Sequence, residues 1–463
     1  MTMALWRLVT LVVAFLVVDA RSSGRSKYAG GGGGGGGSSS TIGHKSGGDG
    51  GGPAAAPEPS NGGYGYYSTN IYDVLSFGAK GDGVTDDTHA FLAAWNQACK
   101  VESSMVEVPA NFVFLVKPLV FSGPCQNNLV FQVDGTIVAP TSAKAWNGTS
   151  LLQWIEFARV HGLLLQGSCT GAINGNGPAW WNSSCKAKGH KTSKSCDIPT
   201  AVRFYGSSNV VVQHLAIVNS PQTHLKFDSC QGVVVNNVTI SSPYTSPNTD
   251  GIHLQDTRYA AVRSSRVSTG DDCVSIQTGC SNIEIFDMMC GPGHGISIGG
   301  LGRGGTKACV SDVSVHDVVV HTSQNGVRIK TWQGGSGSVS SVHFHNIAVL
   351  NVSNPIVIDQ FYCDGRSCHN QTSGVSISDV SYKNIRGTYT QKSNIHFACS
   401  DSVPCVGIVV ANVELLSARG YDDIPAFCWN SYGEIFSPTV PQVTCLQQGK
   451  PKLGQVQSSY DGC

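Results

Sequence analysis

The chain has 463 residues, with 30 lysines and arginines against 30 aspartates and glutamates, so its formal net charge at pH 7 is zero. This length is enough for one large domain or two ordinary ones. Only 13% of the residues are charged, and the balance of signs excludes a protein that binds nucleic acid through bulk positive charge.

The first 20 residues predict a secretory signal peptide. The segment from Met1 to Arg7 carries one positive charge, the run from Leu8 to Val18 is apolar, and the small residue Ala20 stands near the expected cleavage point. This run is shorter than the roughly 20 apolar residues that usually cross a bilayer, so a signal anchor is the less favoured alternative. We therefore expect a secreted mature protein without a membrane partner.

Seventeen cysteines in a secreted chain predict disulfides, and the odd count leaves at least one free thiol or an intermolecular bond. Cys363 with Cys368 and Cys399 with Cys405 are predicted local bridges. No Cys/His group has zinc spacing, so neither a metal nor another cofactor is predicted. Five Asn-x-Ser/Thr sequons are candidate glycan sites on exposed loops: Asn147, Asn182, Asn237, Asn351 and Asn370.

Residues 21–70 are rich in glycine, serine and proline and include an unbroken glycine run from Gly30 to Gly37. Such a segment has too few apolar residues to offset the entropy of ordering, so we predict a disordered tail. Its role would be a spacer, a contact to a surface outside the cell or a linker without function. Residues 71–463 are predicted to form one domain.

A helix is predicted from Asp87 or Thr88, either of which can cap it, towards Cys99. It would close the open end of a sheet with an apolar stripe of Ala90, Phe91, Ala94, Trp95 and Ala98.

Beyond this helix, short β-branched segments recur, as at 209–213, 232–236, 259–263 and 281–285, with Asn, Gly, Ser and Asp between them. This pattern predicts an all-β parallel β-helix solenoid. A propeller would need about 40 residues per repeat, more than these repeats contain. A sandwich of hairpins is the second choice, because tight Asn-Gly turns are scarce.

Four short motifs follow one another within this region. Asp250, Asp272 and His294 are separated by equal steps, so they would stack if one coil used that many residues. Asp271 adjoins Asp272 and would point to the opposite face of a regular strand, but a bend at Gly270 can turn both carboxylates outward. Three crowded acids cannot all ionise freely, so at least one should keep its proton at mildly acidic pH.

Arg328 and Lys330 follow in the fourth motif and would share one face of a strand. They would form structural salt bridges or grip an acidic ligand. His294 between two glycines would suit close approach of a substrate, whereas we interpret His253 as a structural histidine.

These motifs resemble those of the polygalacturonases, the pectin-hydrolysing glycoside hydrolases, in particular those of plants. The resemblance covers roughly Ile71 to Cys445, and one departure is Gly300, where the family usually has serine. The motifs that carry it are Asn248-Thr-Asp-Gly-Ile-His, Gly270-Asp-Asp-Cys, Cys290-Gly-Pro-Gly-His-Gly-Ile-Ser-Ile-Gly, Arg328-Ile-Lys-Thr-Trp and, at the start of the domain, Phe77-Gly-Ala-Lys-Gly-Asp-Gly-Val-Thr-Asp-Asp.

The resemblance implies a right-handed parallel β-helix that hydrolyses α-1,4 bonds between galacturonates with inversion. It assigns Asp271 as the general acid, Asp250 and Asp272 as the pair that activates water, and His294 as support for the acid. Substrate binding is assigned to four side chains: Arg328, Lys330, Asn248 and, less directly, Tyr362. The implied partner is polygalacturonate or pectin in the cell wall, and the protein is expected to be a monomer.

Two other functions stay open at this stage, a pectate or pectin lyase on the same coil and a catalytically silent wall-binding solenoid. A lyase would want calcium and a strong base, which fits an acid-rich cluster less well. We also predict a disulfide between Cys273 and Cys290, because both adjoin catalytic motifs on neighbouring coils.

Overall fold

The computed structural model describes residues 70–146, 152–182, 184, 198–363, 368–391, 394–420, 424–449, 451 and 463, all within one compact unit, Pro53–Cys463. The predicted signal peptide, the predicted tail as far as residue 69, and Asn147 lie outside these residues. The other four sequon asparagines are exposed. Within the described part, no helix combines the length and the apolar character needed to span a membrane.

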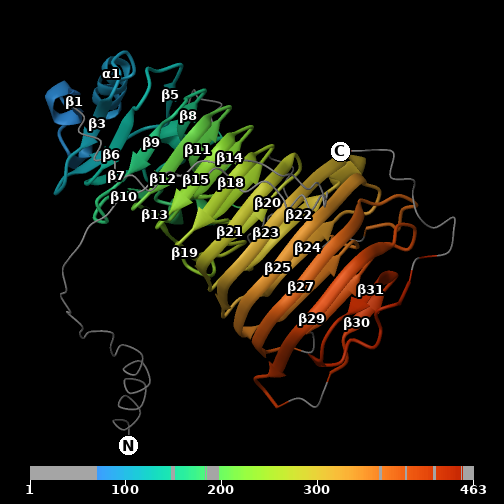
Figure 1. Ribbon diagram of the computed structural model, residues 1–463. Coiled ribbons are helices and arrows are strands. Elements are labelled where there is room, and N and C mark those ends of the chain that lie inside the picture. The colour runs from blue at the N-terminus through green and yellow to red at the C-terminus, as the bar shows by residue number, and fades with distance from the viewer. Residues whose placement is uncertain are drawn as a thin grey trace, which may run out of the picture. The chain divides into compact units, whose positions relative to one another are not determined.

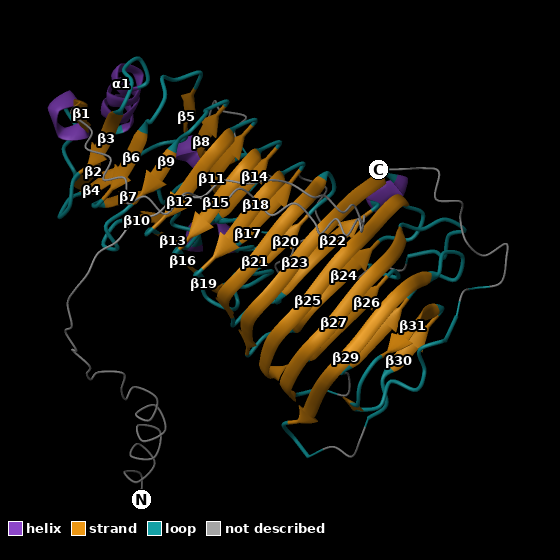
Figure 2. Cartoon of the chain, viewed as in Figure 1, coloured by secondary structure: helices purple, strands orange, loops and turns teal. Residues whose placement is uncertain are grey.

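Parallel strands stack coil upon coil and form two large sheets (Figures 1 and 2). Sheet B has eleven strands: β5 (Leu119–Ser122), β8 (Gln153–Ala158), β11 (Thr200–Tyr205), β14 (Leu225–Asp228), β17 (Ile252–Gln255), β20 (Val274–Ile276), β22 (Ile296–Leu301), β24 (Asn325–Thr331), β26 (Asn354–Asp359), β28 (Ile395–Ala398) and β30 (Phe427–Trp429). The predicted fold class, an all-β right-handed parallel β-helix, is confirmed.

Sheet A contains the other described strands: β1 (Asn70–Asp73), β2 (Asp82–Asp86), β3 (Ser104–Val108), β4 (Val113–Leu115), β6 (Val130–Val133), β7 (Thr136–Val138), β9 (Leu164–Gln166), β10 (Ala172–Asn174), β12 (Ser208–Gln213), β13 (Ala216–Val218), β15 (Gln231–Asn236), β16 (Thr239–Ser241), β18 (Arg258–Arg263), β19 (Arg266–Ser268), β21 (Cys280–Cys290), β23 (Lys307–His321), β25 (Ser336–Val352), β27 (Ser376–Tyr389), β29 (Cys405–Ser417), β31 (Ser431–Ile435) and β32 (Thr439–Val440).

Five short helical segments complete the described structure: α1 (Thr88–Ala98), α2 (Pro178–Trp181), η1 (Val74–Phe77), η2 (Ala143–Trp146) and η3 (Arg303–Gly305). Helix α1 lies at the N-terminal end of the coil (Figure 1), and the five residues of its predicted apolar stripe are all buried. Asp87 stands at the N-cap position but makes no side-chain cap bond. Its carboxylate instead accepts bonds from the backbone N–H groups of Lys80 and Gly81.

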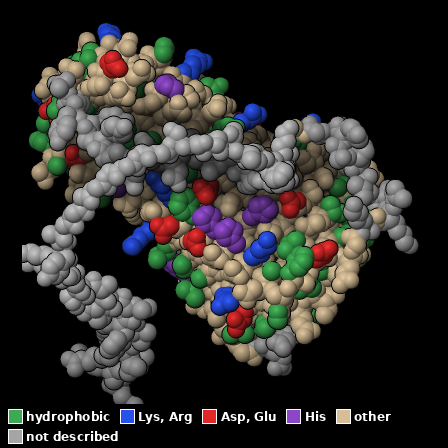
Figure 3. Space-filling model, in the orientation of Figure 1, with side chains coloured by type: hydrophobic (Ala, Val, Ile, Leu, Met, Phe, Trp, Pro, Cys, Tyr) green, Lys and Arg blue, Asp and Glu red, His purple; other side chains and the backbone are tan. Residues whose placement is uncertain are grey.

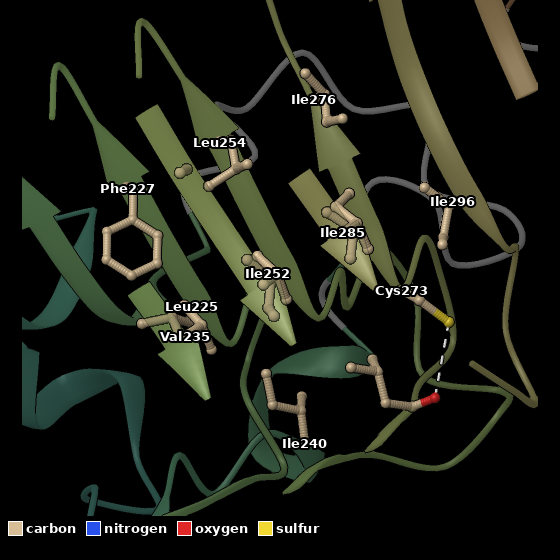
Figure 4. Close-up of a cluster of buried hydrophobic side chains, with 14 of the residues drawn as sticks. Leu225, Phe227, Val235, Ile240, Ile252, Leu254, Cys273, Ile276, Ile285 and Ile296 are labelled. Carbon is tan, nitrogen blue, oxygen red and sulfur yellow. Dashed lines mark hydrogen bonds between the residues drawn. The ribbon is translucent and has the colours of Figure 1, made fainter. Parts of the chain in front are cut away.

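The coil is filled by like residues stacked in register. Phe157, Phe204 and Phe227 stack with ring centroids 5.0 and 5.1 Å apart. Phe227 pairs with Leu254 of β17, and Leu254 pairs with Ile276 of β20, so aliphatic side chains continue the phenylalanine row (Figure 4). Burial of these side chains is the main source of stability, at about 1.5 to 3 kcal/mol for each large one.

Asparagine side chains form a second ladder at a corner of the coil. The side-chain amide of Asn384 donates to Asn346 at 2.9 Å, and that of Asn412 donates to Asn384 at 2.7 Å. All three residues have positive φ, a backbone conformation that asparagine tolerates better than most residues. The enrichment of asparagine between predicted strands therefore reflects the sharp corners of each coil.

Three predicted disulfides are present. Cys273 bonds to Cys290, Cys363 to Cys368, and Cys399 to Cys405. Three more bonds join Cys99 to Cys125, Cys428 to Cys445, and Cys309 in β23 to Cys463 across 154 positions of the sequence. Within the described residues Cys169, Cys230 and Cys280 carry free thiols, as the odd cysteine count allows.

Candidate active site

Three of the motif residues occupy consecutive coils of the β-helix. The backbone N–H of Gly251 donates to the carbonyl of Asp272, and that of Cys273 donates to the carbonyl of Gly295. Asp250, Asp272 and His294 therefore lie side by side, each two residues before the start of β17, β20 or β22, as their equal sequence steps predict. The structure thus brings the three together.

Asp271 and Asp272 lie in the connection between β19 and β20, outside both strands. The chain bends at Gly270, where an added Cβ would lie 1.8 Å from the carbonyl oxygen of Ser246. Only glycine fits so close to this neighbouring backbone. The predicted bend is present, and both carboxylates are largely buried beside the cavities described below.

Asp271 is held by His294. Nδ1 of His294 lies 2.9 Å from Oδ1 of Asp271, and the backbone N–H of His294 donates to the carbonyl of Asp271 at 2.8 Å. The same Oδ1 accepts the backbone N–H of Asp272 at 3.0 Å. Both side-chain bonds end on Oδ1 of Asp271, so they hold the carboxyl group through this oxygen.

Asp272 accepts three side-chain hydrogen bonds. Its Oδ1 accepts bonds from Arg328 at 2.9 Å and Ser297 at 2.8 Å, and its Oδ2 accepts one from Lys330 at 2.8 Å. Between the two alternatives that the sequence left open, Arg328 and Lys330 form a buried salt-bridge cluster here. Both cations also line a cavity of about 330 Å³, described below, so they remain within reach of an anionic ligand.

Asp250 has weaker support. Ser275 donates to its Oδ2 at 2.8 Å, while Nδ1 of His253 lies 3.4 Å from Oδ2 and 2.7 Å from the Ser275 hydroxyl. Burial, and next the negative charge of Asp271, raise the pKa of Asp250. One acid of the cluster was expected to keep its proton, and the raised pKa belongs to a member of the pair assigned to activate water.

Two cavities of about 330 and 320 Å³ meet at Asp271. The first is lined by His294, Arg328 and Gln324, and the second by Asp250 and Asp272. Four residues line both cavities: Asp271, Asn248, Lys330 and Tyr362. All eight residues predicted from the sequence for catalysis or substrate binding therefore lie at these two cavities.

An aromatic wall borders the second cavity. The rings of Trp332 and Tyr362 meet edge to face at 5.3 Å, and Nζ of Lys330 lies 5.4 Å from the centre of the Tyr362 ring. The guanidinium of Arg303 lies 5.1 Å from the Trp332 ring. A cation beside a flat apolar surface is suited to a sugar ring that carries a carboxylate.

The donors needed by a divalent cation are present, because one ligand atom each from Asp271, Asp272 and His294 lies within 4.8 Å of the others. However, both oxygens of Asp272 already bind Arg328 or Lys330, and His294 binds Asp271. A metal ion would have to displace these bonds and sit beside two cations. The arrangement therefore suits acid–base chemistry better than metal binding.

Acidic and basic side chains are interspersed on the face of the molecule that Figure 3 shows. This agrees with a net charge of zero and with the absence of a bulk basic surface on that face.

The raised pKa of Asp250 makes a prediction for stability. Between the ordinary aspartate pKa of about 3.9 and the raised value, the folded protein binds more protons than the unfolded chain, so stability falls as pH rises through that window. The amide of an asparagine at this position would carry no charge, so Asp250→Asn should raise the melting temperature at pH 7 and have little effect at pH 4. Calorimetry of both proteins at the two pH values measures this.

Asp312→Asn on the exposed outer face of β23 is the matched control and should shift both melting temperatures equally. A melting temperature of Asp250→Asn at or below that of the parent at pH 7 would show that the carboxylate does not strain the folded state.

The departure at Gly300 gives another prediction. A Cβ added there would lie 2.7 Å from Nε1 of Trp332 and 3.1 Å from Cδ1 of Tyr362. Gly300→Ser should displace the indole ring into the second cavity and raise KM about threefold to tenfold with a smaller change in kcat. Steady-state kinetics test this, with Gly374→Ser, whose nearest neighbour would be Ser400 at 3.3 Å, as the control. Equal KM values for parent and Gly300→Ser would refute it.

Sequence reasoning missed three polar residues of the site. His253, interpreted as structural, lies beside Asp250, and Ser275 and Ser297 bind Asp250 and Asp272. A signal was available, because each stands three residues after one of Asp250, Asp272 and His294, and the three pair in register. Serine and histidine are too common in such a chain for that signal to stand out without the register.

The chain is similar to known proteins in sequence and in fold. Residues 99–430 match the family described as glycosyl hydrolases family 28. A polygalacturonase of Chamaecyparis obtusa is 44% identical over 84% of this chain and 76% of its own length. Polygalacturonase-2 of Solanum lycopersicum is 42% identical over 81% of each chain. The solved polygalacturonase of Erwinia carotovora has the same fold, with a TM-score of 0.64, 24% identity, and coverage of 76% of this chain and 94% of that one.

Proposed function

The chain belongs to the glycosyl hydrolases of family 28, and we propose that it cleaves the α-1,4 bonds of polygalacturonate by general acid and base catalysis. Hydrolysis of galacturonate polymers is the activity that the named relatives support. The observation that carries the mechanism is the position of Asp271 at the junction of two cavities, with Asp250 and Asp272 in only one of them.

A glycosidic bond laid across Asp271 would place one sugar in each cavity. Asp271 then delivers a proton to the glycosidic oxygen as the bond breaks. His294, 2.9 Å from Oδ1, orients the carboxyl group and stabilises it after the proton has left. Arg328 and Lys330, which line the first cavity, attract the carboxylates of the polymer.

Water attacks the anomeric carbon in the second cavity, where Asp250 and Asp272 hold and activate it. The charge of Asp272 is balanced by two cations, so Asp250 is the acid free to accept the proton from water. Because the pKa of Asp250 is raised, turnover should decline as pH falls through that pKa.

Inversion at the anomeric carbon belongs to this proposal through the family resemblance. Carboxyl groups of inverting enzymes are usually about 6.5 to 9.5 Å apart, wider than the spacing of oxygens from Asp271 and Asp272, which is under 4.8 Å. Proton NMR of the first product formed from polygalacturonate decides the point: a β-anomeric reducing end is expected, and an α-anomeric one contradicts inversion.

The function itself is tested by incubating the protein with polygalacturonate and a chelator. We expect saturated galacturonides and undiminished rates. Unsaturated ends that absorb in the ultraviolet, or loss of activity on chelation, would favour the lyase.

We further propose that the protein acts as a secreted monomer in the cell wall, away from membranes and nucleic acids. The six disulfides of the described residues support an oxidising compartment. Size-exclusion chromatography of the mature protein tests the monomer.

A further inference from the structure

The outer face of sheet B extends beyond Arg328 and Lys330, and two rows of side chains continue along it. Arg328 and Lys330 belong to β24, and each side chain has a partner in register on the following strands. The first row runs from Arg328 through Val357 and His396 to Phe427, and the second from Lys330 through Asp359 and Ala398 to Trp429. Three strand spacings, roughly 14 Å in total, separate β24 from β30.

Two large aromatic side chains stand at the end of these rows. Phe427 is 47% exposed and Trp429 is 53% exposed, while Cys428 between them is bonded to Cys445. Inward-facing Phe397 of the preceding strand is fully buried, so Phe427 and Trp429 lie on the outer face. Exposed aromatic rings on an edge strand reduce solubility, so their presence here indicates a binding surface.

Both rings are held in place. The Phe427 ring stacks on the imidazole of His396, with centroids 4.7 Å apart and planes inclined by 16°. Nε1 of Trp429 donates a hydrogen bond of 2.7 Å to Oδ1 of Asp401. Rings that are fixed before binding lose little entropy when a flat ligand stacks on them.

The exposed charge beside this surface is that of Asp401, which binds Trp429. Asp359, which precedes Ala398 and Trp429 in the second row, is also acidic, but burial raises its pKa. Beyond Lys330 the described residues of the two rows include no lysine or arginine. A free uronate carboxylate would meet repulsion here, whereas a methyl-esterified uronate would not.

We propose that His396, Phe427 and Trp429 form a distal subsite that stacks on a sugar ring of the same pectin chain, with preference for a methyl-esterified galacturonate. This rests on the proposed hydrolysis of polygalacturonate, because the polymer must lie along sheet B to reach from Asp271 to β30. The subsite contributes binding several sugars away from the cleaved bond and takes no part in the chemistry.

The test compares Phe427→Ala and Trp429→Ala with the parent on three substrates. On long, partly methyl-esterified pectin we expect KM to rise about threefold to tenfold, the range expected for loss of one aromatic contact. The rise should be smaller on de-esterified polygalacturonate and absent on the shortest oligogalacturonate that the parent cleaves. Trp429→Phe, which retains a ring, should restore most of the affinity for the esterified polymer.

Phe436→Ala removes an aromatic side chain that is 66% exposed and follows β31 of sheet A, and it should leave KM unchanged on all three substrates. Parent KM values in both alanine variants on esterified pectin would overturn the subsite, and so would an equal rise on the short oligomer. An equal rise on both polymers would overturn the preference for the ester. Failure of the parent to cleave polygalacturonate would instead overturn the proposed function.

Discussion

Asp271→Asn should reduce kcat on polygalacturonate by about a hundredfold to ten-thousandfold, the usual contribution of a general acid. The amide keeps the shape of the carboxyl group and can still bond to His294, but it has no acidic proton to give to the glycosidic oxygen. Ground-state contacts are preserved, so KM should stay within about threefold of the parent value. Steady-state kinetics and direct binding of oligogalacturonate measure the two quantities.

Asp312→Asn on the outer face provides the same chemical change away from the cavities and should leave kcat intact. If Asp271→Asn turns over at a rate near that of the parent, another group must protonate the leaving oxygen. Asp250, with its raised pKa, would then be the first candidate.

Lys330→Ala should damage both stability and turnover. Nζ of Lys330 lies 2.8 Å from Oδ2 of Asp272, with side chains only 8% and 3% exposed. Removal of one partner of a buried pair typically costs about 3 to 5 kcal/mol, and Arg328 should hold the loss near the lower end. Because Asp272 would also lose the cation bonded to its Oδ2, kcat should fall together with the expected rise in KM. Chemical denaturation and kinetics test this.

The variant Lys330→Met separates the loss of the charge from the loss of packing. It keeps Asp272 paired with Arg328 and fills much of the space of the lysine side chain, so it should regain part of the lost stability while kcat stays low. Lys117→Ala is the matched control, because Lys117 and Asp86 form an exposed pair at 3.0 Å, with 48% and 35% side-chain exposure. Its loss should cost at most about 1 kcal/mol. A stable Lys330→Ala protein with normal kcat and raised KM would mean that Lys330 only binds substrate.

The sequence could predict that Asp250, Asp272 and His294 stack, because the coils that carry them have one constant length. Asp250, Asp272 and His294 keep their equal steps in space, as the pairing of β17, β20 and β22 shows. The apolar stripe of α1 could also be predicted, because the apolar residues of an amphipathic helix recur with the helical period on its buried face.

The pairing of Asp272 with both cations could not be read in the same way. Arg328 lies beside Ser297, and Lys330 beside Gly299, so small side chains on β22 let both cations reach across a whole coil. The contact depends on the size of the side chains on the neighbouring strand and on the insertion between β22 and β24. The spacing of the repeats in the sequence gives neither of these.

The bond between Cys309 and Cys463 has a consequence for how the molecule comes apart. In a solenoid each coil contacts only its neighbours, so the coils near one end can open while the rest stays folded. This bond encloses β25, β27, β29 and β31 in a single covalent ring anchored on β23. A coil that opens at that end stays looped back to β23, so it gains less conformational entropy than a free chain end would gain. Opening at that end should therefore be less favourable while the bond is intact and more favourable once a thiol reduces it.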